Sequence, residues 1–454
     1  MTKLLLPLLS FFSLPAFAQW DSVSTTIDTV QSAGGSFQVS DGWSFSSAEE
    51  YDASDFIQAK VDQFYVSVER KPDSLAQVSW RLVQQRLRPG ELFVDFLLTE
   101  FNDKECFLTS IIRPSGLPEV VIIPRLQERG TSVKQANARG IDVGNAQAAG
   151  SYMAYKNLLA HLEPKLDGAQ TIYYSTSNDL NLANLKFLKG IDGRFLFEKY
   201  NLVRLHSAAS FLSRHNRLLF PKKMKVLLLG NVAYDCGGET EHYWDALPGS
   251  GVEIRNIAAL LKSAHQVDVL DSCAATESRF VGAVNKTPYD ILHLATHGFY
   301  FPPAGSQRFG LAAGSYPLLF TGIVLAGANG KNASVDYANE GGMFTTMDFK
   351  KLNVGNIRLV VLSTCFSGTG FSGEDRSEHS SAPFGLTLAL LRQGIQAMVL
   401  SNRAIPDKET MEFMTQFYRN LARTLDADAA FTQTLRELQK TKPRVDWSFM
   451  DLVH

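Results

Sequence analysis

The sequence predicts an α/β protein built on a doubly wound, mostly parallel sheet flanked by helices. From residue 225 onward short apolar runs alternate with amphipathic segments, a pattern typical of parallel strands joined by crossover helices. Each run is bounded by Gly, Ser or polar residues, as buried strands are. The predicted strands are 226–229, 267–270, 289–296, 323–325, 359–363 and 397–400, and the predicted helices are 252–264, 277–285, 381–393, 407–424 and 428–440.

The part of the chain before residue 225 indicates an N-terminal α/β extension. Apolar residues at helical spacing predict helices over 48–69, 74–88 and 151–163. Residues 91–99 and 119–123 are predicted strands, and the Ser-, Thr- and Gly-rich segment 19–47 a loop or weak strand. We expect four parts: a signal peptide (1–18), an N-terminal extension of loop and helix (19–74), an intermediate region (75–224) and the core (225–454).

Composition and charge narrow the class of protein. The chain has 454 residues, of which 45% are hydrophobic and 20% charged, as in soluble globular proteins. The formal net charge is −2, with no dominant basic patch, which argues against nucleic acid and anionic membrane as partners. No later stretch is long and apolar enough to predict a membrane span.

The N-terminus has the pattern of a cleavable export signal. Lys3 supplies a positive charge, residues 4–14 form an apolar core, and Ala16-Phe17-Ala18 is a small-x-small cleavage site. We therefore expect cleavage after Ala18 and a mature protein that is periplasmic or secreted.

The four cysteines limit which disulfides can form in such an oxidising compartment. They are Cys106, Cys236, Cys273 and Cys365. If Cys365 stays a free thiol, at most one internal disulfide forms, and proximity in sequence favours Cys236 with Cys273. The alternative, that the remaining three are buried apolar thiols, stays open.

A histidine and a cysteine follow two of the predicted strands. His297 comes after the run 289–296 and Cys365 after the run 359–363. Functional groups in open α/β sheets lie outside the carboxyl ends of the strands, so these two residues form a candidate nucleophile–base pair. Gly298 beside His297 allows close approach of a substrate and offers its N–H to an oxyanion. A buried structural cysteine at position 365 is the competing interpretation.

The other histidines and one acidic residue have simpler interpretations. His293 is favoured as a hydrogen-bonded core histidine, with an indirect role near the site as the alternative. Asp290 is equally a turn carboxylate or a residue that orients the site. His242, His265 and His379 lie in polar contexts and are predicted at the surface.

Several site classes are excluded by spacing. No Cys or His spacing fits a metal site. Residues 327–330, Gly-Ala-Asn-Gly, lack the Lys-Ser/Thr of a phosphate-binding loop and predict a turn. Because Ser363 replaces the first glycine of a nucleophile elbow and only His379 and His454 follow Cys365, an α/β-hydrolase is disfavoured.

With these residues identified, the chain resembles the CHAT family of caspase-like domains. The two candidate catalytic motifs match in order, as 293–298 (His-Leu-Ala-Thr-His-Gly) and 360–365 (Val-Val-Leu-Ser-Thr-Cys). Spaced matches extend the resemblance over roughly residues 75 to 454. They are 80–94, 185–187, 193–196, Tyr200, 247–249, Glu253, 384–386, 406–407 and 447–449.

The resemblance implies a caspase-like doubly wound sheet and a cysteine endopeptidase that needs no cofactor. By motif, His297 is the general base or imidazolium partner, Cys365 the nucleophile, and the N–H groups of Gly298 and Cys365 the oxyanion hole. Hydrolysis of a protein or peptide substrate then passes through a thioester. The resemblance also assigns 75–224 to the N-terminal part of the CHAT region and 225–454 to the catalytic core.

The chain departs from the family pattern in three places. Thr364 and Phe366 flank the cysteine where the family usually has a small residue and an acidic or polar one, and Arg403 replaces a late tryptophan. No tetratricopeptide repeats precede the domain, so the usual partner-binding or regulatory module is missing or reduced to residues 19–70, and a regulatory protein partner stays an open alternative. The alternative function is a catalytically silent scaffold or interaction module on the same fold.

Overall fold

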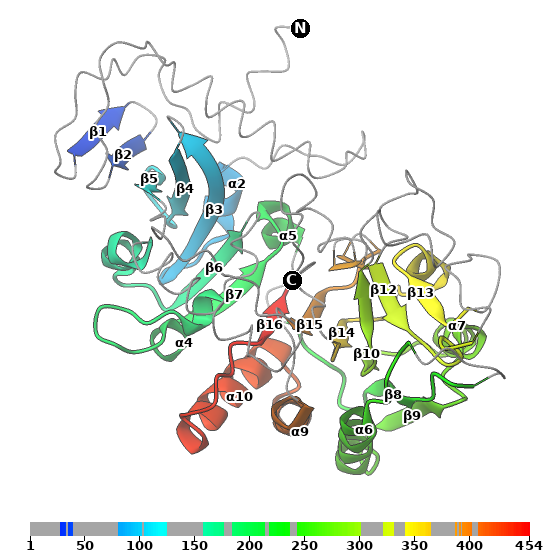
Figure 1. Ribbon diagram of the computed structural model, residues 1–454. Helices are drawn as coiled ribbons and strands as arrows, with labels where there is room; N and C mark the ends of the chain where they lie inside the picture. The colour runs from blue at the N-terminus through cyan, green and yellow to red at the C-terminus, as the bar shows by residue number, and fades with distance from the viewer. Residues whose placement is uncertain are drawn as a thin grey trace, which may run out of the picture. The chain divides into compact units, whose positions relative to one another are not determined.

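The chain divides into two compact units, Met1–Ser213 (unit 1) and Arg214–His454 (unit 2) (Figure 1). The boundary expected from the sequence at residues 224/225 stays a prediction. The computed structural model describes residues 28–32, 35–39, 80–101, 104–124, 158–176, 184–213, 218–236, 243–300, 321–330, 341–364, 386–387, 390–391, 393–401 and 407–454.

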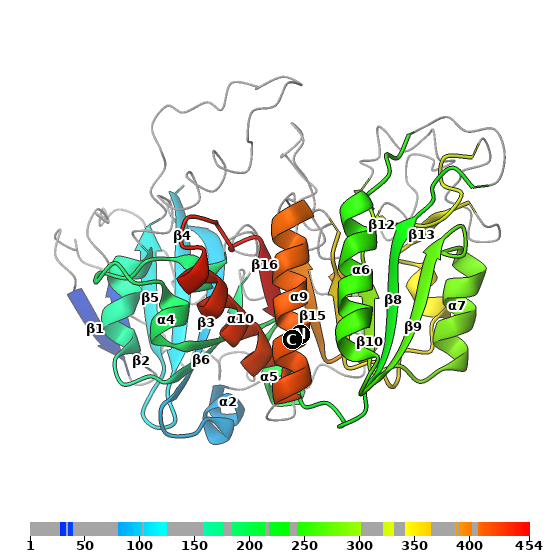
Figure 2. The ribbon, with the colours of Figure 1, turned by 90° about the horizontal axis from the view of Figure 1, so that it is seen from below.

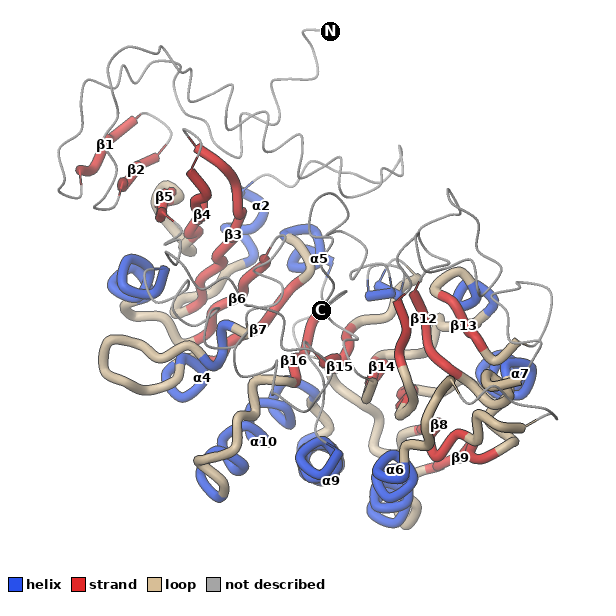
Figure 3. The backbone as a smooth tube through the Cα atoms, in the orientation of Figure 1, coloured by secondary structure: helices blue, strands red, loops and turns tan. Residues whose placement is uncertain are grey.

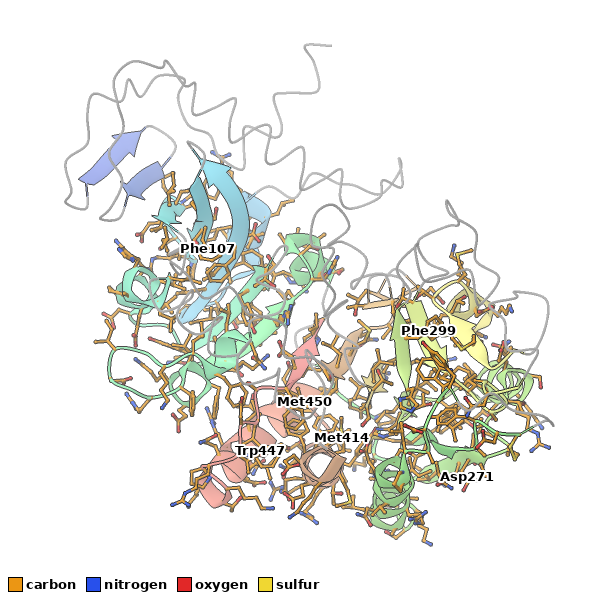
Figure 4. The ribbon with its side chains drawn as sticks, in the orientation of Figure 1. Phe107, Asp271, Phe299, Met414, Trp447 and Met450 are labelled. Atoms are coloured by element: carbon orange, nitrogen blue, oxygen red, sulfur yellow. A yellow bond between two sulfur atoms is a disulfide. The ribbon has the colours of Figure 1, made fainter. Side chains whose placement is uncertain are left out.

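Unit 1 contains a mixed sheet. Its strand order is β1 (Asp28–Ser32), β2 (Gly35–Val39), β5 (Glu119–Pro124), β4 (Lys104–Ile112), β3 (Glu91–Phe101), β6 (Thr171–Thr176) and β7 (Asn201–Leu205). Strands β3, β4 and β5 are antiparallel neighbours, whereas β6 runs parallel to both β3 and β7. Phe107 of β4 lies buried in this unit (Figure 4).

Two short helices cover part of that sheet. They are α2 (Trp80–Arg86) and α5 (Ala208–Ser213), and a third, α4 (Leu196–Lys199), precedes β7. Trp80 and Val83 of α2 pack with Phe93 of β3 and Phe211 of α5. The structure confirms strands at 91–99 and 119–123, whereas β4, β6 and β7 are not predicted by the sequence pattern. The predicted helix 48–69 lies outside the described residues.

Unit 2 is built on the sheet that the alternation predicts. Its order is β16 (Met450–Val453), β15 (Ala397–Ser401), β14 (Leu359–Leu362), β10 (Ile291–Leu294), β8 (Lys225–Val232) and β9 (Gln266–Ser272). All neighbours are parallel except β15 and β16. A mostly parallel sheet flanked by helices confirms the predicted fold class.

Helices cover both faces of this sheet. The two-residue side-chain period sends Leu292 and Leu294 of β10 to one face, where they pack with Phe280 of α7 (Glu277–Lys286). Ile291 and His293 face the other side, which is covered by α6 (Pro248–Leu261), α9 (Asp407–Thr424) and α10 (Ala427–Thr441) (Figures 2 and 3). Met414, Trp447 and Met450 are fully buried near α9, α10 and β16 (Figure 4).

A second, small sheet corrects one strand assignment. Strands β11 (Gly298–Tyr300), β12 (Thr321–Val324) and β13 (Met343–Thr345) form an antiparallel sheet of their own. The prediction that 323–325 belongs to the parallel sheet is therefore wrong, because an apolar run does not encode its pairing partner. Gly322 is required there, since a Cβ would lie 2.2 Å from the carbonyl oxygen of Phe344.

Short 3-10 turns complete the described elements. They are η1 (Glu163–Leu166), η3 (Leu185–Phe187) and η6 (Asp348–Lys351). Among the helices that the structure describes, none combines the length and apolar character needed to cross a bilayer.

Candidate active site

His297 lies at the junction between the two sheets of unit 2. It follows β10 of the parallel sheet and immediately precedes β11 of the small sheet. Its backbone N–H donates to the hydroxyl of Tyr234 at 3.3 Å, and its carbonyl accepts from Val324 N at 2.9 Å. These two contacts fix the backbone of a residue whose side chain is only half-buried.

The imidazole of His297 is hydrogen-bonded through one of its two nitrogens among the described residues. Nε2 lies 2.8 Å from the carbonyl oxygen of Asp245, and because a carbonyl only accepts, Nε2 carries the proton. In the neutral ring Nδ1 is then the acceptor. No residue of the described ranges is a hydrogen-bond partner of Nδ1. The ring is thus held through Nε2, and Nδ1 is unpaired as far as the described residues go.

Two aromatic rings flank the imidazole. The ring centroid of Tyr234 is 5.2 Å from that of His297, and the centroid of Trp244 is 5.3 Å away. Such contacts restrict rotation of the ring and reduce its access to water.

The Tyr234 hydroxyl has a defined direction. Thr296 Oγ1 donates to Val324 O at 2.5 Å, so it must accept from Tyr234 at 2.8 Å. Tyr234 therefore donates to Thr296 and accepts from the N–H of His297. Burial raises the pKa of the Tyr234 hydroxyl above its usual value, which keeps it neutral and able to donate.

The segment that contacts the histidine ring is held by a buried asparagine. Asn329 lies in the turn after β12, and its side-chain oxygen accepts from Tyr243 N at 3.0 Å and Trp244 N at 2.7 Å. Its Nδ2 donates to Trp244 O at 2.9 Å and to Asp235 Oδ1 at 2.8 Å. Residues 327–330 form the expected turn, with Gly330 N donating to Gly327 O and Gly327 at φ +89°.

A disulfide lies close by in the chain. Cys236, two residues after Tyr234, is bonded to Cys273, so the structure selects the pair that proximity favours. Cys106 is buried in β4. The bond ties the chain after β8 to the chain after β9, beside the residues that surround His297.

The cysteine of the candidate pair lies outside the described residues. The chain is described up to Thr364, which is buried, and Ser363 N donates to Leu294 O at 2.9 Å. The roles of His297, Gly298 and Cys365 therefore stay predictions. His242, His379, Phe366 and Arg403 also lie outside the described residues.

His293 is a core residue, as the sequence favours. Its side chain is fully buried, and Tyr418 Oη lies 3.2 Å from Nδ1. Its Nε2 is 2.9 Å from Glu253 Oε1, close enough for an ion pair although the angle falls outside that of a hydrogen bond.

The contacts of Asp290 decide between its two predicted roles. Asp290 accepts from Lys225 N at 2.9 Å and lies 3.7 Å from the Arg358 guanidinium, so it organises the start of β10 rather than the site.

The prediction that His265 is at the surface is wrong. His265 is 8% exposed, its Nδ1 accepts from Met224 N at 3.2 Å, and burial lowers its pKa.

Four residues around His297 are missed by the sequence analysis. They are Tyr234, Trp244, Asp245 and Asn329. Only Asn329 stands within a segment that attracts attention, the Gly-rich turn, and its role there comes from contacts distant in sequence. Within the described ranges, no three His, Cys, Asp or Glu side chains cluster as metal ligands.

Comparison with known proteins identifies the family. The CHAT domain model matches residues 151–451. No match is found among curated proteins.

Two solved structures show distant likeness. One is the crystal structure of gingipain R, an Arg-specific cysteine proteinase, with TM-score 0.40, 9% identity, 66% of this chain covered and 66% of that chain, just under two thirds of its length. The other is a complex of the pro- and mature domains of RgpB from Porphyromonas gingivalis, with TM-score 0.37, 10% identity, and 68% and 70% covered. Likeness at this level carries no argument about chemistry. The match over most of the chain, on a mostly parallel sheet flanked by helices, does identify it: this chain belongs to the CHAT domain family.

Proposed function

We propose that this chain is an exported, caspase-like cysteine endopeptidase that hydrolyses peptide bonds with a His297–Cys365 dyad. The observation that carries the proposal is the orientation of His297. Nε2 is held by the Asp245 carbonyl, while Nδ1 has no partner within the described residues. A histidine that accepts a thiol proton needs this division of labour between its nitrogens.

The strand register supports Cys365 as the partner. β10 and β14 are parallel neighbours, and Leu294 pairs with Leu362 at the ends of the two strands. His297 and Cys365 follow these paired positions by the same number of residues, and Ser363 N still donates to Leu294 O. The segments that follow β10 and β14 thus start side by side at the same edge of the sheet.

Gly298 is suited to stabilise an oxyanion. Gly298 pairs with Ile323, and the flanking bond from Val324 N to His297 O makes this a non-hydrogen-bonded pair of the antiparallel ladder. The Gly298 N–H therefore faces away from β12. We assign this N–H, together with that of Cys365, to the developing oxyanion.

The chemistry follows from these assignments. His297 Nδ1 takes the proton of Cys365, the thiolate attacks the substrate carbonyl, and the C–N bond breaks as the imidazolium returns the proton to the leaving amine. Water, deprotonated by His297, then hydrolyses the thioester and regenerates the thiol. The Asp245 carbonyl stabilises the imidazolium in both steps because it accepts from Nε2–H.

Export is supported by the signal-like N-terminus and by the disulfide. Disulfides persist in oxidising compartments, and Cys236–Cys273 is the kind of bond expected there. The substrates in this proposal are proteins or peptides outside the cytoplasm.

Cleavage of a degenerate peptide library tests the proposal. The protein from Gln19 onward is assayed with a mild reductant, and mass spectrometry verifies that Cys236–Cys273 stays intact and Cys365 is reduced. We expect cleavage that falls by at least about 1000-fold in Cys365→Ala and in His297→Ala, with circular dichroism unchanged. Equal cleavage by the variants contradicts the dyad. No cleavage by folded protein with a free Cys365 favours the silent scaffold.

A further inference from the structure

Asn329 is a buried amide whose hydrogen-bonding groups are all used. Its side chain is 1% exposed, and it makes four side-chain bonds, two as acceptor and two as donor. Its backbone N–H donates to Tyr234 O at 2.9 Å. An amide with both donors and its acceptor engaged has one orientation only.

Three of these bonds end on Trp244 and Tyr234, whose rings lie against that of His297. The backbone of Trp244 is bound at both its N–H and its carbonyl by the one amide. The next carbonyl along the chain belongs to Asp245 and accepts from His297 Nε2, and the Trp244 ring lies against the imidazole. Through its N–H, Asn329 also holds the backbone of Tyr234, the second residue whose ring lies close to the imidazole.

The turn that carries Asn329 is itself fixed. Gly327 N donates to Ala233 O at 3.3 Å, and Ala326 N donates to Ala275 O at 2.9 Å. A Cβ on Gly342 would approach Ala328 N to 2.6 Å, so the chain is closely packed there. Asn329 thus transmits the position of a rigid turn to the 243–245 segment.

We infer that Asn329 is a positioning residue of the proposed peptidase. It sets the direction of the Asp245 carbonyl, and this carbonyl fixes the tautomer and rotation of the His297 ring. The inference rests on the proposed function for its kinetic consequences, whereas the tautomer can be measured without turnover. Asn329 touches no substrate or reacting atom in this account.

Asn329→Asp is the sharpest variant, because it keeps the shape and one acceptor but loses both donors. It also sets a carboxylate against Asp235. We expect kcat to fall by about 100-fold with KM little changed, since a displaced catalytic group costs rate rather than binding.

The double variant Asp235→Asn, Asn329→Asp restores one donor–acceptor pair with the roles exchanged. We expect it to regain part of the lost kcat, about tenfold. Asn353→Asp, at an exposed asparagine in the same unit, is the matched control and should behave as wild type.

Nitrogen-15 NMR of histidine-labelled protein separates this inference from the proposed function. His297 is assigned from the spectrum of His297→Gln. We expect the Nε2–H tautomer in the wild type and a mixture of tautomers in Asn329→Asp, whether or not peptides are cleaved. If Asn329→Asp does not fold, the double variant is measured instead. The nitrogen-15 shifts of its His297 should lie between those of the wild type and those of a mixture of the two tautomers. An unchanged His297 tautomer in folded Asn329→Asp, or in the folded double variant where that one is measured, would overturn the inference.

Discussion

His293 and His297 lie four residues apart in one apolar run and have opposite surroundings. The His293 ring is fully buried, with Glu253 beside one nitrogen and Tyr418 beside the other. The His297 ring is half-buried, with one nitrogen on a backbone carbonyl and no partner for the other within the described residues. The buried histidine, with a side chain beside each nitrogen, belongs to the core, whereas the described residues leave one nitrogen of the half-buried histidine without a partner, as the proposed role requires.

Truncating each histidine should therefore affect different properties. His293→Ala leaves the Glu253 carboxylate buried without its partner, and we expect a loss of about 3–5 kcal/mol in the free energy of unfolding. His297→Ala removes a half-exposed hydrogen bond and should cost about 1 kcal/mol. Urea unfolding of both variants measures the difference. Equal midpoints would show that the buried pair does not stabilise the fold.

A smaller effect is expected at Tyr418, the other neighbour of His293. Burial, with the Glu253 carboxylate as the secondary cause, holds the pKa of Tyr418 well above its usual value. Above about pH 10 the unfolded chain loses the phenol proton while the folded chain keeps it, so stability present below pH 10 declines as pH rises. Tyr418→Phe should flatten this decline.

Urea midpoints measured between about pH 9 and pH 11 check the expectation. Tyr243→Phe, at an exposed ring, is the matched control and should leave the decline as in the wild type. The same slope in Tyr418→Phe and the wild type would contradict the account of the buried cluster.

Much of the core sheet could be predicted from sequence because its strands are buried on both faces. Continuous apolar runs mark β8, β10, β14 and β15. The strands that were missed, such as β6 and β16, interleave polar residues. These strands are stabilised by pairing with strands distant in sequence, and the local sequence pattern does not predict such pairing.

The candidate site was only partly predictable for the same reason. His297 and Gly298 stand out because they follow a strand, and the run before Cys365 is equally clear. The contact that orients His297 is made by the backbone carbonyl of Asp245, which any residue type could supply. Asn329 acts across 85 residues of sequence on Trp244, and only the folded chain brings the two together. The polar neighbours of His265 in the sequence predict exposure, because its bond to Met224 forms only in the folded chain.

The rate at which Cys365 is alkylated, followed against pH by mass spectrometry in wild type and His297→Ala, tests the central claim most directly. If His297 accepts the thiol proton, the wild-type apparent pKa of Cys365 lies well below the ordinary value of about 8.5, and it returns toward that value in His297→Ala. Identical profiles near pH 8.5 in both proteins would contradict the dyad.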